Sequence, residues 1–115
     1  MKVYRICERK NGELLTLFHG INGSRKLPKG EWVTAVIKTV RDGSRKRAKA
    51  YQSGFHTLAD LEETRKFTKR FTANRDLVIV ECEIGGKIWK KEHSPANILL
   101  AEKIKINKIV EKVNI

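Results

Sequence analysis

Cysteine is scarce in this chain, and its scarcity excludes disulfide-rich and zinc-thiolate proteins. Only Cys7 and Cys82 occur among 115 residues, and they do not form a CxxC pair. Two cysteines cannot build a disulfide framework or a four-thiolate zinc site. The histidines His19, His56 and His93 lack the HxxxH type of spacing that would complete a metal set. We therefore expect no metal, and two partly buried free thiols in a reducing compartment.

Long apolar runs and enzyme signatures are also missing. No stretch approaches the roughly 18 apolar residues of a membrane span, and the opening segment MKVYRICERK has no apolar core of a secretory signal. No Walker, Rossmann or GxSxG motif occurs. At this length the chain is expected to form a single domain, residues 1–115. We expect a protein of the cytoplasm, or of the host cytoplasm if it is viral, that does not contact membranes.

Negative charge is in short supply as well. The chain has 13 Asp and Glu against 25 Lys and Arg, a formal net charge of +12. A small domain needs a net charge of only about 2–8 for solubility. The excess predicts a polyanionic partner, either nucleic acid or a nucleoprotein complex. A module that binds an acidic protein partner is the alternative.

The densest basic run covers residues 41–49, directly before an aromatic-histidine segment at 51–56. Smaller basic clusters lie at 25–29, 65–75 and 87–91. Each phosphate that such cations neutralise releases counterions and strengthens binding without reading bases. For some clusters, a solvated face that only keeps the protein soluble is the alternative. The candidate nucleic-acid contacts are Arg25, Lys26, Arg41, Arg45, Lys46, Arg47, Lys49, Tyr51, Arg65, Lys69 and Arg70.

Four aromatic residues lie within a few positions of basic side chains: Trp32, Tyr51, Phe55 and Trp89. Exposed rings next to cations can stack on the bases of single-stranded nucleic acid. Tyr51 and Phe55 are the better candidates because they sit beside a loop. The alternative is that these rings belong to the core, as aromatic residues on strands of small domains usually do.

The hydrophobic pattern predicts a mostly antiparallel sheet with one main helix packed on it, an α+β fold. Turn signals stand at Asn11-Gly12, Asp42-Gly43 and Gly85-Gly86. The helix is expected at about 58–71, with Thr57 as its N-cap. Strands are expected at 2–8, 13–19, 31–40, 77–84, 87–92 and 98–106, with an edge strand within 45–52.

One carboxylate stands out in the last predicted strand. In a regular strand, Glu102 would share a face with Leu100 and Ile104. A carboxylate among apolar neighbours must be paired, protonated or placed in a cleft. The alternative is a one-residue bulge that turns Glu102 outward and Ala101 inward.

Four short pieces of the chain, Tyr4-Arg5, Gly54-Phe55-His56, Val78 to Glu83 and Ala101 to Ile104, form a pattern that spans most of its length. In this pattern the chain resembles small uncharacterised proteins of phages and prophages. The resemblance implies no function of its own. A phage or mobile-element accessory protein, such as an inhibitor of a nucleic-acid-guided host defence complex, would fit the basic surface.

A second set of residues resembles the ADP-ribosyltransferase fold. Leu17 to Gly20 is similar to that family's strand ending in His-Gly, residues 51–56 to its aromatic turn, and Glu102 to its catalytic glutamate. In the second element Phe-His replaces the usual aromatic-Ser/Thr pair. The resemblance implies NAD as cofactor, catalytic roles for Glu102 and His19, and cofactor contacts from His19, Gly20, Tyr51 and Phe55.

We favour a small non-enzymatic protein that binds RNA, DNA or a nucleoprotein complex. The charge and the missing enzyme signatures support it. An NAD-binding protein of the transferase type, active or degenerate, is the alternative from another class.

Overall fold

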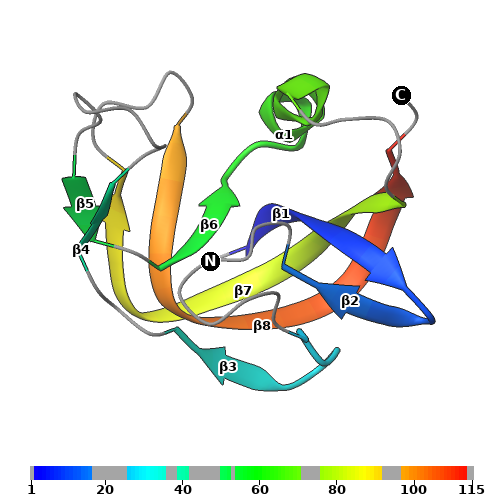
Figure 1. Cartoon of the computed structure of the whole chain (residues 1–115), viewed down its shortest axis with the longest axis horizontal. Coiled ribbons are helices and arrows are strands. Elements are labelled where there is room, and N and C mark those ends of the chain that lie inside the picture. Colours follow the sequence, from blue (N-terminus) through cyan, green and yellow to red (C-terminus); the bar gives the residue numbers. More distant parts are fainter. Residues whose placement is uncertain are drawn as a thin grey trace.

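The structure of the protein is a computed structural model (Figure 1) that describes residues 2–16, 26–35, 39–41, 50–52, 54–70, 76–91 and 97–113. The elements in chain order are β1 (Lys2–Lys10), β2 (Glu13–Leu15), β3 (Trp32–Thr34), β4 (Thr39–Arg41), β5 (Ala50–Gln52), β6 (Phe55–Leu58), α1 (Leu61–Phe67), the 3-10 turn η1 (Thr68–Arg70), β7 (Leu77–Lys90) and β8 (Ile98–Lys112). Every pair of strands among them is antiparallel. The prediction of a mostly antiparallel sheet with one helix is confirmed, although the helix is short.

The first hairpin forms where the sequence predicts it. Asn11 and Gly12 have φ angles of 53° and 78°, the left-handed conformation of a two-residue hairpin turn. Lys10 pairs with Glu13 directly across this turn. The returning strand is described only over Glu13–Leu15, and residues 17–19 of the predicted strand lie outside the described residues.

The long pair β7–β8 forms the centre of the sheet. The two strands have 14 and 15 residues and curve together across the molecule (Figure 1). The predicted hairpin at Gly85-Gly86 is wrong, because β7 runs through both glycines to Lys90. The register shifts there from Gly85↔Lys103 to Ile88↔Ala101, so Gly86 and Lys87 together face Glu102. Two residues opposite one make a β-bulge, which bends a strand instead of ending it.

The strand pairings close into a ring. β1 pairs with β7, β7 with β8, β8 with β6, and β6 returns to β1 through Tyr4 and Leu58. The guanidinium of Arg5 strengthens this closure, since its Nη1 donates a 2.9 Å hydrogen bond to the carbonyl of His56. Apolar side chains fill one side of this sheet: Val3, Cys7, Leu14, Leu27, Phe55, Val78, Val80, Cys82, Ile84, Ala101, Ile104 and Ile106.

The helix begins later than predicted. Thr57 is not its N-cap; it lies in strand β6, where it is fully buried and its hydroxyl donates to the carbonyl of Leu99 at 2.9 Å. Asp60 caps the helix instead, with its carboxylate accepting from the amide of Glu62 at 3.3 Å. Pairing with β8 outweighs the capping preference of Thr57, because all four residues of β6 find a partner residue on β8. The helix packs Leu61 and Phe67 over the apolar cluster of Ile6, Leu77 and Ile79.

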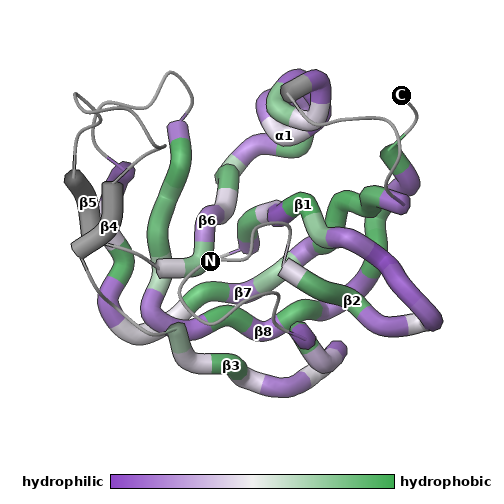
Figure 2. Tube along the Cα trace, viewed as in Figure 1, coloured by the Kyte–Doolittle hydropathy of each residue, from purple (hydrophilic) through white to green (hydrophobic). Residues whose placement is uncertain are grey.

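The predicted strand 31–40 is interrupted. Its first part is β3, which pairs with β8, and its last part is β4, which pairs with β5 in a separate two-stranded sheet. Residues 36–38 lie outside the described residues. The expected edge strand is described over Ala50–Gln52, while 42–49, with the predicted Asp42-Gly43 turn, are not described. Figure 2 shows the contrast along the chain between the apolar start of β8 and the hydrophilic end of the β1–β2 hairpin.

Candidate nucleic-acid interface

The sheet face opposite the buried cluster carries an exposed indole ring. Trp32 pairs with Lys105 across β3 and β8, and Thr34 pairs with Lys103. On the far side of β8, Lys103 pairs with Gly85. Directly opposed residues of an antiparallel pair point to the same face. Trp32, Thr34, Lys103 and Lys105 therefore share one face with the bare backbone of Gly85; we call these five residues the Trp32 face.

The Trp32 ring lies across β8 and reaches β7. A Cβ atom placed on Gly85 would lie 3.3 Å from Cζ3 and 3.4 Å from Cη2 of the indole. The ammonium of Lys105 stands 5.8 Å from the ring centroid, within the range of a cation–π contact. Half of Trp32 remains exposed, at 50%. Glycine inside a strand often marks such a close approach, so the sheet leaves room for a ring that is held on one side and open on the other.

Two lysines belong to this face, and further exposed lysines lie elsewhere on the described part of the chain. Lys105 pairs with Glu83 at 3.6 Å, whereas Lys103 is exposed and has no carboxylate partner in the described part of the chain. Further exposed lysines without an ion pair among the described residues are Lys10, Lys29, Lys66, Lys69, Lys87, Lys90, Lys108 and Lys112. Lys26, a predicted contact, is exposed but pairs with Glu13 at 3.2 Å. The structure thus leaves most of these surface lysines uncompensated.

The densest basic run begins at the end of the β4–β5 ribbon. Arg41 pairs with Ala50, the last matched positions of the two strands. Tyr51 lies one step further along, opposite Val40. Arg41 and Ala50, the two residues that flank positions 42–49, therefore lie side by side. Four predicted contacts, Arg45, Lys46, Arg47 and Lys49, lie outside the described residues, as do Arg25, His19 and Gly20.

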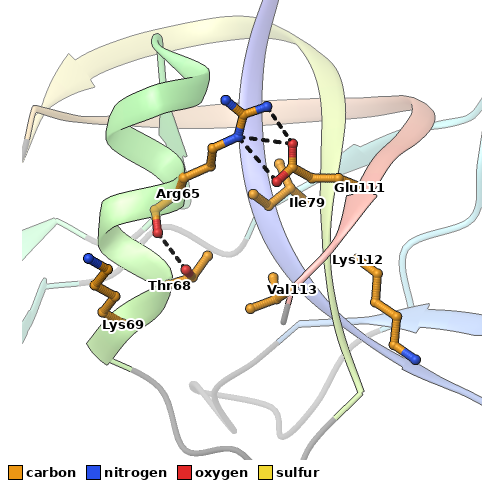
Figure 3. A pocket seen from close by; sticks show the side chains of 7 residues that line it. All are labelled: Arg65, Thr68, Lys69, Ile79, Glu111, Lys112 and Val113. Atoms are coloured by element: carbon orange, nitrogen blue, oxygen red, sulfur yellow. Dashed lines mark hydrogen bonds and ion pairs between the residues drawn. The ribbon is translucent and has the colours of Figure 1, made fainter. Parts of the chain in front are cut away.

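A second basic region borders a cleft of about 320 Å³ between α1, η1 and the end of β8 (Figure 3). Arg65 crosses this cleft and donates to both carboxylate oxygens of Glu111, at 2.8 to 3.2 Å. It also pairs with Glu62. The hydrogen bonds that Arg65 donates to Glu111 raise the pKa of Arg65 above its ordinary value. Arg65 therefore joins the helix to β8, while the exposed Lys69 and Lys112, which also line the cleft, make no ion pair among the described residues.

Phe55 does not offer a ring for stacking. It is 5% exposed and belongs to the buried cluster, and the guanidinium carbon of Arg5 lies 5.6 Å from its centroid. The prediction that Phe55 is a better stacking candidate than Trp32 is wrong. The sequence carried one signal that could have corrected it: Thr34, a polar residue, alternates with Trp32 on the face opposite Val33.

Glu102 is tied to the backbone of the bulge in β7. Its side chain is partly exposed, and its Oε1 accepts a hydrogen bond from the amide of Lys87 at 3.2 Å. Leu100, Ala101 and Ile104 are fully buried. Ala101 and Ile104 belong to the same buried cluster, which a regular alternation would not allow. Strand β8 therefore changes the face that it buries at Glu102. Ala101 points inward, as the bulge alternative expected, but the extra residue of the bulge lies on the partner strand β7.

The side chains of both cysteines lie in the buried cluster of the sheet. Cys7 and Cys82 are free, as expected, but they are fully buried where the sequence predicted partly buried thiols. Burial raises the pKa of Cys82 to about 12, and it also raises the pKa of Cys7, against the opposing effect of Arg5. Thiols of this kind are poor nucleophiles at neutral pH.

Comparisons with family models, curated proteins and solved structures give no match for this chain. Both resemblances in the sequence therefore stay predictions. Among the described residues, no group of three or more His, Cys, Asp or Glu side chains could hold a metal ion. In the same part of the chain, no helix has the length and apolarity needed to cross a membrane.

Proposed function

We propose that this protein is a small non-enzymatic binding protein for nucleic acid, alone or within a nucleoprotein complex. The observation that carries the proposal is the set of exposed lysines without a carboxylate partner in the described part of the chain. A formal net charge of +12 and the basic run 41–49 at the end of the β4–β5 ribbon support it. Exposed cations that make no ion pair within the described residues can contact the phosphates of a polyanion.

Binding of this kind depends steeply on salt. Each phosphate contact adds about −0.9 to the slope of log K against log salt on duplex DNA, and about −0.7 on single strands. Fluorescence anisotropy with labelled single- and double-stranded oligonucleotides, from about 50 mM salt upward, measures this slope. We expect binding that weakens by more than tenfold as salt increases to about 200 mM. No binding to either form at about 50 mM salt, where such contacts are strongest, would refute the proposal.

The basic run is tested by neutralising Arg45, Lys46 and Arg47 together with glutamine. These side chains lie beyond the described residues, and the run holds the densest positive charge of the chain. We expect a several-fold loss of affinity and a shallower salt slope, since up to three phosphate contacts disappear.

A charge-matched control separates this local effect from the loss of net charge. Lys2 and Arg9 already pair with Glu81 and Asp76 in the fold and are not among the predicted contacts. Replacing these two cations with glutamine removes the same charge as the double variant Arg45→Gln, Lys46→Gln. An equal loss of affinity in both double variants would show that only the net charge matters and that the run 41–49 has no particular role.

A further inference from the structure

We infer that the Trp32 face is a stacking site for one base of a single-stranded nucleic acid, with Lys103 and Lys105 beside the backbone of the bound nucleotide. This inference rests on the proposed function and adds to it the kind of nucleic acid that is bound. It selects single strands over duplexes, and it assigns the contact to residues outside the basic run.

The first support is that the ring is presented instead of buried. An aromatic residue on a strand of a small domain normally fills the core, yet Trp32 is 50% exposed. Its position is not loose, because the pairing with Lys105 and the close approach to Gly85 support one side of the ring. A ring that is supported below and open above is ready to stack without first losing conformational freedom.

The second support is charge beside the ring. Lys103 and Lys105 are two steps apart on β8, about 6.6 Å along the strand, and the indole crosses β8 near both. A nucleotide stacked on the ring would have a cation within reach for its phosphates. Lys103 has no carboxylate partner among the described residues, while Glu83 partly compensates Lys105. Lys103 is therefore the stronger phosphate contact.

The third support is the geometry of the ligand. Bases in a duplex already stack on both faces, so an exposed ring on a sheet can take only an unpaired base. Stacking on an aromatic ring tolerates every base. We therefore expect a preference for single strands with little sequence preference.

The Trp32 face also lies close to the β4–β5 ribbon, where the basic run 41–49 begins. The pairing of β3 with β8 extends to Ala35, whose amide donates to the carbonyl of Glu102 at 2.7 Å. From Ala35 the chain reaches Thr39, the first residue of β4, in four steps, a span of at most about 14 Å. A single strand of several nucleotides can thus contact both the ring and the ribbon.

The test compares the affinity of Trp32→Ala with that of the original protein for a single strand of about 12 nucleotides and for the matching duplex. We expect about a tenfold loss of affinity for the single strand, the effect of losing one stacked base, and less than a twofold change on the duplex. Because Trp32 is half exposed, the variant should keep its fold, which the circular dichroism spectrum checks. Gly85→Ala is the second variant: its methyl group would lie 3.3 Å from the indole, so the ring must shift by a few tenths of an ångström, and single-strand binding should weaken less than in Trp32→Ala.

Two further readouts make the result specific. Trp32 and Trp89 are the two tryptophans of the chain, so a Trp89→Phe background leaves the fluorescence of Trp32 alone to report stacking by quenching. Lys103→Gln should reduce the salt slope on single strands by about 0.7.

The outcomes separate the two proposals. Salt-dependent binding that Trp32→Ala leaves unchanged on both ligands would overturn the stacking site and leave the proposed function standing. Equal affinity for single strands, duplexes and polyglutamate of similar charge would also overturn the stacking site, because it would show that charge alone is recognised. No binding to any nucleic acid would refute the proposed function itself.

Discussion

Replacing Gly86 by alanine is expected to destabilise the fold by about 2–3 kcal/mol, because two costs meet at this position. Gly86 has a φ angle of +68°, where an L-residue costs about 1–2 kcal/mol. A methyl group there would also lie 3.0 Å from Cβ and 3.1 Å from Cδ of Glu102. The Glu102 side chain must then move and lose its hydrogen bond from the amide of Lys87, worth about 0.5–1.5 kcal/mol.

Gly12 supplies a matched control. It also has a positive φ angle, +78°, but a Cβ atom on Gly12 would meet no heavy atom within 4 Å. Gly12→Ala therefore carries the backbone cost of about 1–2 kcal/mol without the steric one. The difference between the two variants measures the contact with Glu102.

The assay is urea unfolding near neutral pH for Gly86→Ala, Glu102→Ala and the double variant. In the absence of the carboxylate, Gly86→Ala should cost about 1 kcal/mol less, which is the coupling energy of the pair. Additive costs, together with equal losses in Gly86→Ala and Gly12→Ala, would refute the placement of Glu102 over the bulge. A confirmed coupling would give Glu102 a structural role and count against its use as a catalytic residue.

Two further predictions concern burial. The pKa of Cys82 rises from its ordinary 9.0 to about 12, so in alkali the unfolded thiol loses its proton while the folded one keeps it. The contribution of this thiol to the free energy of unfolding is therefore fully present below about pH 9 and is smaller by about 1.4 kcal/mol at pH 10. Cys82→Ala should remove this part of the pH dependence in urea titrations under reducing conditions. A pH dependence that the substitution leaves unchanged would contradict the prediction. Leu100→Ala, at a fully buried site, should cost about 2–5 kcal/mol in the same assay. Ile88→Ala, at a side chain that is 40% exposed, should cost less than about 1 kcal/mol, and equal losses would contradict the burial of β8.

Local patterns predicted the elements whose cause is local. Asn11 and Gly12 form a two-residue turn because only a few residue types adopt the left-handed conformation at low cost. The alternation from Leu77 onward predicts a strand because side chains alternate across a pleated sheet. The helix was expected at about 58–71, and it is present over Leu61–Phe67, with a later start and an earlier end.

Predictions failed where a partner strand decides between two local outcomes. Gly85-Gly86 suits a turn or a bulge equally well, and the continued pairing with β8 makes it a bulge. Thr57 suits an N-cap or a strand, and its place between β1 and β8 makes it a strand residue. The difference between Phe55 and Trp32 is of the same kind. Apolar and polar residues alternate after both rings, so the local pattern does not separate them. Closure of the sheet buries Phe55 and leaves Trp32 exposed.

By itself the sequence determined the charge and the strand-rich composition of this protein, because each of these is a sum or a short-range pattern over residue types. Only the tertiary structure decided which cations remain uncompensated and which ring is open to a ligand. Those properties depend on distances between segments far apart in the chain, such as Trp32 and Gly85, or Arg65 and Glu111. No local pattern contains such distances, since they arise only when the strands pair and the sheet closes.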